Sequence, residues 1–341
     1  MSKYQPGEAR AWAREQLSGC CGCVMPSFTD DLSDLNEAAI RHDVALEKQL
    51  GMSSVLIVSE CGTTEEEFAR FVEIVVDEAG SDLATVVQLA QPTLDRTRAA
   101  ATMAYSAGVD LALLCYPQFF YPRSEDDVFA FTKTVADETP LGIMIFAMNL
   151  WNFGRLHPAG FSMDLLRRFV TEIPNVAAIK NEIGIPGAGG ISHVFESFRD
   201  EVLVTDPMET NMPAWVKQYG QRFMGTSNYE YYADQTPRIL KLLQNADTYE
   251  EGMAAWWKLH PARLANAAVT AEISAGTSTV HRLVWKYQGW LMGFNGGPVR
   301  PPTPRINDAQ MTRLRSAALA SGLPVTDDED HLFFRGRVAA G

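Results

Sequence analysis

Short apolar runs alternate with longer amphipathic stretches along the first 232 residues of the chain. The apolar runs have the length and composition of buried strands, and they predict strands over residues 22–25, 53–58, 83–89, 109–115, 141–146, 176–180, 202–205 and 222–225. The stretches between them repeat their apolar residues at helical spacing. They predict helices over residues 7–16, 34–50, 93–107, 125–138, 162–171, 192–199 and 211–219, with one more that begins at Thr64.

Eight strands that alternate with helices predict an α/β fold of the (β/α)8, or TIM barrel, type. An open doubly wound sheet is the alternative, but no Gly-x-Gly-x-x-Gly follows the first strand, which weighs against a dinucleotide-binding sheet. Beyond residue 232 the pattern predicts only helices, over residues 235–244, 249–268, 280–291 and 308–321. We therefore expect a barrel with a short N-terminal helix over residues 1–232 and a C-terminal helical extension, packed on the barrel, over residues 233–341.

Composition narrows the range of partners. The 341 residues are 46% hydrophobic and carry a formal net charge of −13, which argues against nucleic acid or an anionic membrane as a partner. No apolar run has the length of a membrane span, and the first residues lack the apolar core of a signal peptide. Cys20 and Cys23 form a Cys-x-x-Cys without a second pair of ligands, so we interpret them as strand residues that pack as small hydrophobes. These features predict a cytoplasmic protein.

The predicted strand over residues 176–180 ends on Lys180, and Glu182 follows two residues later. Removing an ammonium group from water is unfavourable, so a lysine at the end of a buried strand either reaches solvent or becomes a nucleophile. The plain alternative is a strand-end lysine that is capped by Glu182.

In a (β/α)8 barrel the catalytic groups lie where strands end and the following loops begin. Reading off those positions collects polar residues from several strands: Ser27, Glu60, Gln88, Gln118, the loop over residues 147–157, Lys180 with Glu182, Asp206 with Glu209, and residues 226–229. Lys180 is therefore expected among polar groups that converge on one face.

Several motifs, taken in order, resemble one family. They are residues 26–28 (PSF), the acidic helix start after the second strand, residues 116–122 (YPQFFYP), Ile179 with Lys180, and residues 297–302 (GPVRPP). Together they resemble the dihydrodipicolinate synthase and N-acetylneuraminate lyase group of class I aldolases. The resemblance implies that Lys180 forms a Schiff base with a 2-oxo acid, often pyruvate, in a homotetramer or homodimer without a cofactor.

The chain departs from this family at its substrate-binding loops. Where the family has Gly-Thr-Thr-Gly-Glu after the second strand, this chain has Ser59, Glu60 and Cys61. Ser59 and the backbone are candidates to hold a substrate carboxylate, whereas Glu60 either contributes to the site or caps the next helix. After the fourth strand, where tyrosines are usual in the family, Gln118 and Phe119 stand, with Tyr121 close by.

The clearest departure follows the fifth strand, where Phe146 stands in place of the family's proton-transferring tyrosine. The loop beyond it contains Asn149, Trp151, Arg155 and His157. His157 is a candidate acid or base, Arg155 a candidate anion partner and Trp151 a candidate aromatic wall. The plain alternative is an enlarged surface loop.

We expect a carbon–carbon or carbon–oxygen lyase, an aldolase or hydratase-aldolase with a bulky, partly aromatic acceptor. Lys180, His157 and Tyr121 are the predicted catalytic residues, and the predicted substrate-binding residues are Ser59, Glu60, Gln118, Phe119, Phe146, Asn149, Trp151, Arg155 and Asp206. A metal-dependent aldolase that uses Glu182, Asp206 and Glu209 is one alternative, and a non-catalytic 2-oxo-acid sensor is another. No metal is expected. His193 and His260 lie in predicted helices, and we interpret them as structural.

Overall fold

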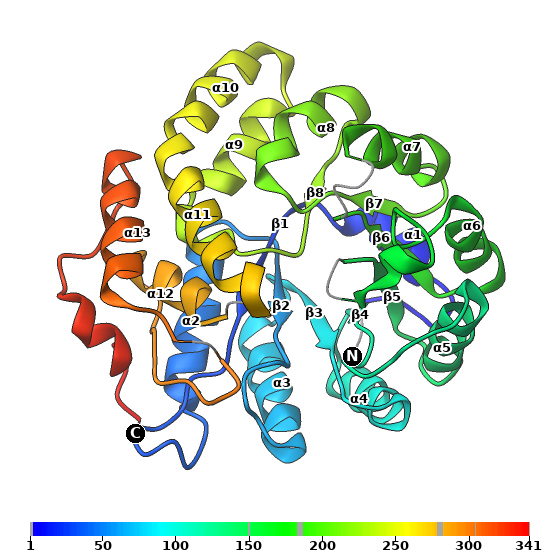
Figure 1. Ribbon diagram of the computed structural model, residues 1–341, viewed down its shortest axis with the longest axis horizontal. Coiled ribbons are helices and arrows are strands. Elements are labelled where there is room, and N and C mark those ends of the chain that lie inside the picture. Colours follow the sequence, from blue (N-terminus) through cyan, green and yellow to red (C-terminus); the bar gives the residue numbers. More distant parts are fainter. Residues whose placement is uncertain (1–2, 149–150, 183–186, 278–281, 304, 341) are drawn as a thin grey trace. The chain divides into compact units, whose positions relative to one another are not determined.

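The computed structural model describes residues 3–148, 151–182, 187–277, 282–303 and 305–340. In these residues the strands of an eight-stranded sheet alternate with helices along the chain (Figure 1). The strands are β1 Gly19–Val24, β2 Ser54–Ile57, β3 Ala84–Leu89, β4 Leu111–Leu114, β5 Gly142–Phe146, β6 Val176–Lys180, β7 Leu203–Thr205 and β8 Phe223–Met224. This is the order of a (β/α)8 barrel, and the predicted fold class is confirmed.

The predicted helices are present, most with ends that differ by a few residues. Those up to β8 are α1 Ala9–Gln16, α2 Glu37–Gln49, α3 Glu65–Ala79, α4 Leu94–Ala107, α5 Glu125–Asp137, α6 Met163–Glu172, α7 Ala188–Phe198 and α8 Met212–Tyr219. Later come α9 Gln235–Leu243, α10 Tyr249–Lys258, α11 His260–Thr277, α12 Arg282–Leu291 and α13 Asp308–Ala320. Short 3₁₀ turns are η2 Phe153–Arg155, η3 Glu209–Asn211, η4 Glu230–Tyr232, η5 Ala246–Thr248 and η6 Asp330–Phe334. No helix among the described residues is both long enough and apolar enough to cross a membrane.

The single helix predicted over residues 249–268 is wrong. The structure has two helices there, α10 and α11, which meet at Leu259. Pro261 falls in the first turn of α11, where its missing N–H is harmless, but the same residue could not continue α10. The periodicity of the apolar residues runs across this break, which is why the pattern did not reveal it.

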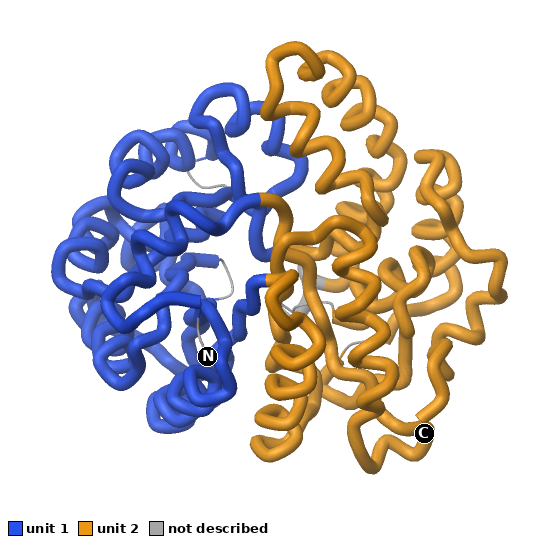
Figure 2. The backbone as a smooth tube through the Cα atoms, turned by 180° about the vertical axis from the view of Figure 1, so that it is seen from behind, with its two compact units in different colours: residues 1–18, 84–226 blue, residues 19–83, 227–341 orange. Residues whose placement is uncertain are grey.

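The chain forms two compact units (Figure 2). The first comprises Met1–Ser18 and Ala84–Thr226, and the second comprises Gly19–Leu83 and Ser227–Gly341. The second unit therefore contains β1, α2, β2 and α3 together with the C-terminal helices. The boundary at residue 232 that we expect from the sequence stays a prediction.

In the first unit, β3 to β7 pair in parallel in sequence order, and all their residues are buried. Helix α1 packs at the amino end of β6, where Arg10 donates hydrogen bonds of 2.9 to 3.2 Å to the carbonyl oxygens of Val170, Ile173 and Val176. Tyr4 stabilises the amino end of β5, because its hydroxyl accepts a hydrogen bond from the Gly142 N–H at 2.7 Å. The N-terminal segment thus covers the amino ends of these strands and leaves their carboxyl ends to the loops.

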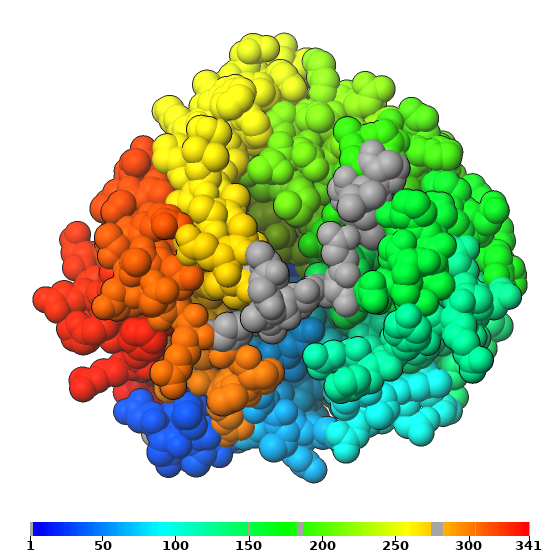
Figure 3. Space-filling model, viewed as in Figure 1, coloured from blue at the N-terminus to red at the C-terminus, as the bar shows by residue number. Residues whose placement is uncertain are grey.

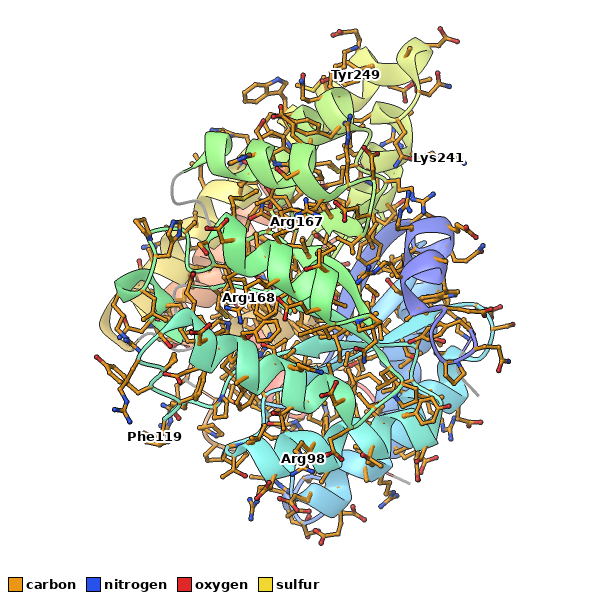
Figure 4. All side chains as sticks on the ribbon, turned by 90° about the vertical axis from the view of Figure 1, so that its right-hand side faces the viewer. Arg98, Phe119, Arg167, Arg168, Lys241 and Tyr249 are labelled. Atoms are coloured by element: carbon orange, nitrogen blue, oxygen red, sulfur yellow. The ribbon has the colours of Figure 1, made fainter. Side chains whose placement is uncertain are left out.

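Ion pairs join neighbouring helices on the surface of the first unit. Arg98 of α4 pairs with Glu138 at the end of α5, Arg168 of α6 with Asp126 of α5 at 2.6 Å, and Arg167 of α6 with Glu201 beyond α7 at 2.6 Å. The three arginines are labelled in Figure 4, and α4, α5 and α6 lie side by side in Figures 1 and 3. Exposed pairs of this kind each contribute about 0–1 kcal/mol, so the order of the helices rests mainly on burial.

In the second unit, β1 and β2 pair in parallel. Helix α3 begins with a capping box in which the Thr64 hydroxyl accepts from the Glu67 N–H and Glu67 accepts from the Thr64 N–H, as its acidic start predicts. Glu67 also forms a 2.7 Å ion pair with Arg300, whose guanidinium lies 4.0 Å from the ring centroid of Phe28. The motif over residues 297–302 therefore ties the C-terminal region to α3 and to the end of β1.

Candidate active site

Lys180 is buried at the carboxyl end of β6 although it carries an ammonium group. Its exposed fraction is 6%, and its Nζ lies 2.8 Å from Glu182 Oε2. The Phe146 ring lies 4.6 Å from Nζ to its centroid. A carboxylate and an aromatic face both stabilise a cation, so protein groups replace much of the water that an exposed lysine would have.

The strand register explains which residues surround Lys180. Phe146 at the end of β5 and Thr205 at the end of β7 stand opposite Lys180 in the sheet. The Thr205 hydroxyl donates to the Phe223 carbonyl at 2.8 Å and accepts from the Gly225 N–H at 3.3 Å. Both neighbours of Lys180 are therefore fixed by rigid strands, which is the support that a reactive side chain needs.

Asp206 follows β7 as predicted, but its carboxylate is bonded within the protein. It accepts hydrogen bonds from the Met208 N–H at 2.8 Å, from Asn211 at 2.8 Å and from the Trp215 indole N–H at 2.6 Å. Burial raises the pKa of Asp206, the three donors oppose that rise, and the charge of Glu182 adds to it. These contacts order the loop after β7, and substrate binding by Asp206 stays a prediction.

The alternative metal site does not form in the described part of the chain. No group of three or more His, Cys, Asp or Glu side chains stands close enough there to hold a metal ion. Glu182, Asp206 and Glu209 are all in the described residues, so they do not constitute such a group.

A cavity of about 120 Å³ lies next to the end of β6. Its lining is mostly apolar and includes Ile179 and Lys180, with His157 and His193 also among the lining residues. Successive strand residues point to opposite faces, and neither Glu182 nor Phe146, which contact the ammonium, lines this cavity.

The loop after β5 separates into packed and exposed residues. Phe153 is buried in an aromatic cluster, with its ring centroid 4.9 Å from that of Tyr116, so it is a core residue. Trp151 packs edge-on against Phe146 with a centroid distance of 5.5 Å. Phe146 in turn contacts the Lys180 ammonium. Asn149 lies outside the described residues.

Arg155 and Tyr121 contact each other at the rim of the unit. The Arg155 guanidinium lies 3.7 Å from the Tyr121 ring centroid and donates to the Pro122 carbonyl. Tyr121 is 69% exposed, and Gln118 and Phe119 beside it are exposed as well. His157 accepts a 3.2 Å hydrogen bond at Nδ1 from the Ala159 N–H. The proposed roles of these residues stay predictions.

Ser59 and Glu60 belong to the second unit. Glu60 Oε2 forms a 2.7 Å ion pair with Arg282 of α12, whose side chain is buried. The helix that follows is capped by Thr64 and Glu67, so the suggestion that Glu60 serves as the cap is wrong. Substrate binding by Ser59 and Glu60 stays a prediction.

The geometry agrees with a comparison of the whole sequence with protein families. A family model described as the Dihydrodipicolinate synthetase family matches residues 16–317, which is most of the chain. The chain belongs to the dihydrodipicolinate synthetase family.

Individual members of the family are distant. A 4-hydroxy-tetrahydrodipicolinate synthase of Anaplasma marginale (strain Florida) is 28% identical over 176 residues, which cover 50% of this chain and 55% of the relative. This chain thus spans about half the length of that relative. The N-acetylneuraminate lyase of Fusobacterium nucleatum has a TM-score of 0.70 at 17% identity, over 89% of this chain and 98% of that one. The 4-hydroxy-tetrahydrodipicolinate synthase of Methylacidiphilum fumariolicum SolV has a TM-score of 0.74 at 13% identity, over 90% and 96%.

This member of the family also has buried charged residues that the sequence reasoning missed. Asp43 and Glu47 of α2 and Lys286 of α12 are buried, and the Lys286 ammonium donates to the Pro26 carbonyl at 2.5 Å and to the Ser27 hydroxyl at 2.9 Å. Burial lowers the pKa of Lys286 to about 8. The sequence contains a signal of these buried carboxylates, because Asp43 and Glu47 interrupt the apolar face of α2 at helical spacing.

Proposed function

We propose that this protein is a Schiff-base lyase that forms an imine between Lys180 and a 2-oxo acid. The observation that carries the proposal is the buried Lys180 ammonium at the carboxyl end of β6, between the Glu182 carboxylate and the Phe146 ring. In a (β/α)8 barrel that end of the strands is where catalytic groups collect. Membership of the dihydrodipicolinate synthetase family supports the same chemistry.

The chemistry of an imine suits a lyase. The Lys180 amine adds to the ketone carbon of the 2-oxo acid, water leaves, and the product is a protonated imine. This imine accepts the electron pair that is released when a bond from the neighbouring carbon to its substituent breaks, and an enamine results. The enamine is then protonated or attacks an acceptor, which regenerates an imine. Hydrolysis of that imine returns the free lysine.

We also propose how the substrate is placed. Trp151, in the loop after β5, packs on Phe146, which itself contacts the Lys180 ammonium, and it would border an acceptor.

The proposal is tested by trapping with borohydride. Incubation with pyruvate and sodium borohydride should reduce the imine to a stable secondary amine, which peptide mass spectrometry should locate at Lys180. A panel of other 2-oxo acids extends the test to the substrate class. If no compound in the panel gives an adduct, the protein is not a Schiff-base enzyme, and the alternative of a 2-oxo-acid sensor then predicts ligand binding without turnover.

Chelation separates the proposal from a metal-dependent aldolase. A Schiff-base mechanism draws its electron sink from the imine, so EDTA should leave turnover unchanged. A loss of turnover that magnesium or manganese restores would instead contradict the proposal, because a metal ion would then supply the electron sink. The protein without EDTA but with the same added ions is the control.

A further inference from the structure

Glu182 stands beside the Lys180 amine with an oxygen that is available to a proton. The Oε2 to Nζ distance is 2.8 Å, and the two side chains are 28% and 7% exposed. Glu182 Oε2 itself is buried and makes no hydrogen bond within the described residues. Its contact with the ammonium has the distance of an ion pair but lacks the alignment of a hydrogen bond.

The other polar groups near this pair are already committed. The charge of Glu182 raises the pKa of Asp206, and the Asp206 oxygens accept bonds from Met208, Asn211 and Trp215. Thr205, opposite Lys180 in the strand register, is bonded on both sides to the backbone of the β8 region. The Phe146 ring on the remaining side carries no proton to transfer.

We propose that Glu182 is the group that carries the proton while the imine on Lys180 forms, an assignment that rests on the proposed Schiff-base function. In the first step the carboxylate takes one proton from the ammonium and leaves a neutral amine with a free electron pair. The amine attacks the ketone carbon, the C=O π bond breaks, and the amine proton moves to oxygen to give a carbinolamine. The Glu182 carboxyl group then returns its proton to the carbinolamine hydroxyl, which leaves as water as the C=N bond forms.

This balance explains why a carboxylate at ion-pair distance from the lysine serves catalysis. An ammonium has no free electron pair and cannot attack, so a neighbour must hold its proton during the addition. The same proton is needed in a later step on the leaving oxygen, and one group beside the amine can supply it. Imine hydrolysis at the end of the reaction runs through the same steps in reverse.

The test measures how fast the imine forms with pyruvate, by quenching with borohydride at timed intervals and recording the mass increase. We expect Glu182→Gln to form the adduct at Lys180 about 10²-fold more slowly than the wild type, and to reach a similar final extent. The rate in the variant should rise steeply with pH, because solvent must then take the ammonium proton. Glu201→Gln, which removes the 2.6 Å surface pair with Arg167 (Figure 4), is the matched control and should behave as wild type.

Chemical rescue distinguishes a proton carrier from a merely structural residue. In Glu182→Ala, added formate should accelerate imine formation, whereas chloride at the same ionic strength should not. A Glu182→Gln protein that forms the imine at the wild-type rate, or a Glu182→Ala protein that formate does not accelerate, would overturn the inference. Failure of the wild type itself to form an adduct would instead refute the Schiff-base function, so the two failures are distinct.

Discussion

At the scale of single residues, Lys180 combines burial with a position that contributes little to the core. It is the last residue of β6, and its ammonium contacts Glu182 and Phe146. Lys180→Ala should therefore abolish imine trapping and turnover while the protein stays folded by circular dichroism. Lys133→Ala, which removes a surface lysine that pairs with Asp137 at 2.7 Å, should retain both. Wild-type turnover in Lys180→Ala would refute the proposed function.

The proton transfers that follow imine formation concern His157 and Tyr121. In the neutral form of His157 the ring proton is on Nε2, because Nδ1 accepts a hydrogen bond from the Ala159 N–H. We predict that His157→Ala or Tyr121→Phe lowers turnover by about 10²-fold while imine trapping survives, with steady-state kinetics and borohydride trapping as the paired measurements. If both variants keep near-full turnover, the loops after β4 and β5 are structural, and a water molecule or the substrate carboxylate carries these protons.

At the scale of elements, α2 brings a buried acid pair against β1. A side chain at Gly22 would place its Cβ 2.6 Å from both Glu47 carboxylate oxygens and 2.7 Å from Glu230 Oε1, so only glycine allows this approach. Glu230 also accepts the Cys23 N–H. In the described residues neither Glu47 oxygen nor Glu230 Oε2 meets a donor, and a proton held between the two carboxyl groups would join two of these three oxygens in a hydrogen bond.

Because of this carboxyl pair, we predict that the protein becomes less stable as pH rises. Burial raises the pKa of Glu230 from 4.5 to about 7. Burial and repulsion from Glu230 raise the pKa of Glu47 well above its usual value, and the negative charge of Asp43 adds to both shifts. Between about pH 4.5 and 7 the folded protein therefore keeps a proton that the unfolded chain has released, and the free energy of unfolding decreases as pH rises through that window, by an amount on the order of 3 kcal/mol.

The variant Glu47→Gln tests this effect, since the amide keeps the shape but does not ionise. Urea unfolding from pH 5 to 8 should show a smaller loss of stability in Glu47→Gln than in the wild type, with the variant more stable at pH 8. Glu66→Gln, at an exposed position in the first turn of α3, is the control. Parallel curves for the wild type and Glu47→Gln would show that the pair does not share a proton.

At the scale of the whole molecule, the loop after β4 exposes apolar surface. Phe119 is 91% exposed and projects from the ribbon in Figure 4. Exposed aromatic residues of this size are typical of protein interfaces. We predict a homo-oligomer by light scattering at micromolar concentration, and a smaller particle for Phe119→Asp. A wild-type monomer at that concentration would contradict the prediction.

The sequence by itself determined the order of strands and helices, because burial on both faces of a strand and on one face of a helix leaves a different period in the chain. It also placed Lys180 at the end of a strand, since the apolar run stops there. It did not reveal the break at Leu259, because Pro261 is compatible with the first turn of a new helix and the apolar period continues across it.

Only the tertiary structure decided which groups meet. Strand register brought Phe146 and Thr205 beside Lys180, and loop packing placed Phe153 in an aromatic core and Arg155 on Tyr121. The approach of Glu47 to Glu230, and of Arg282 to Glu60 222 residues away in the chain, leaves no local pattern. A pattern along the chain records how each residue relates to water, whereas contacts between distant residues depend on how the elements pack.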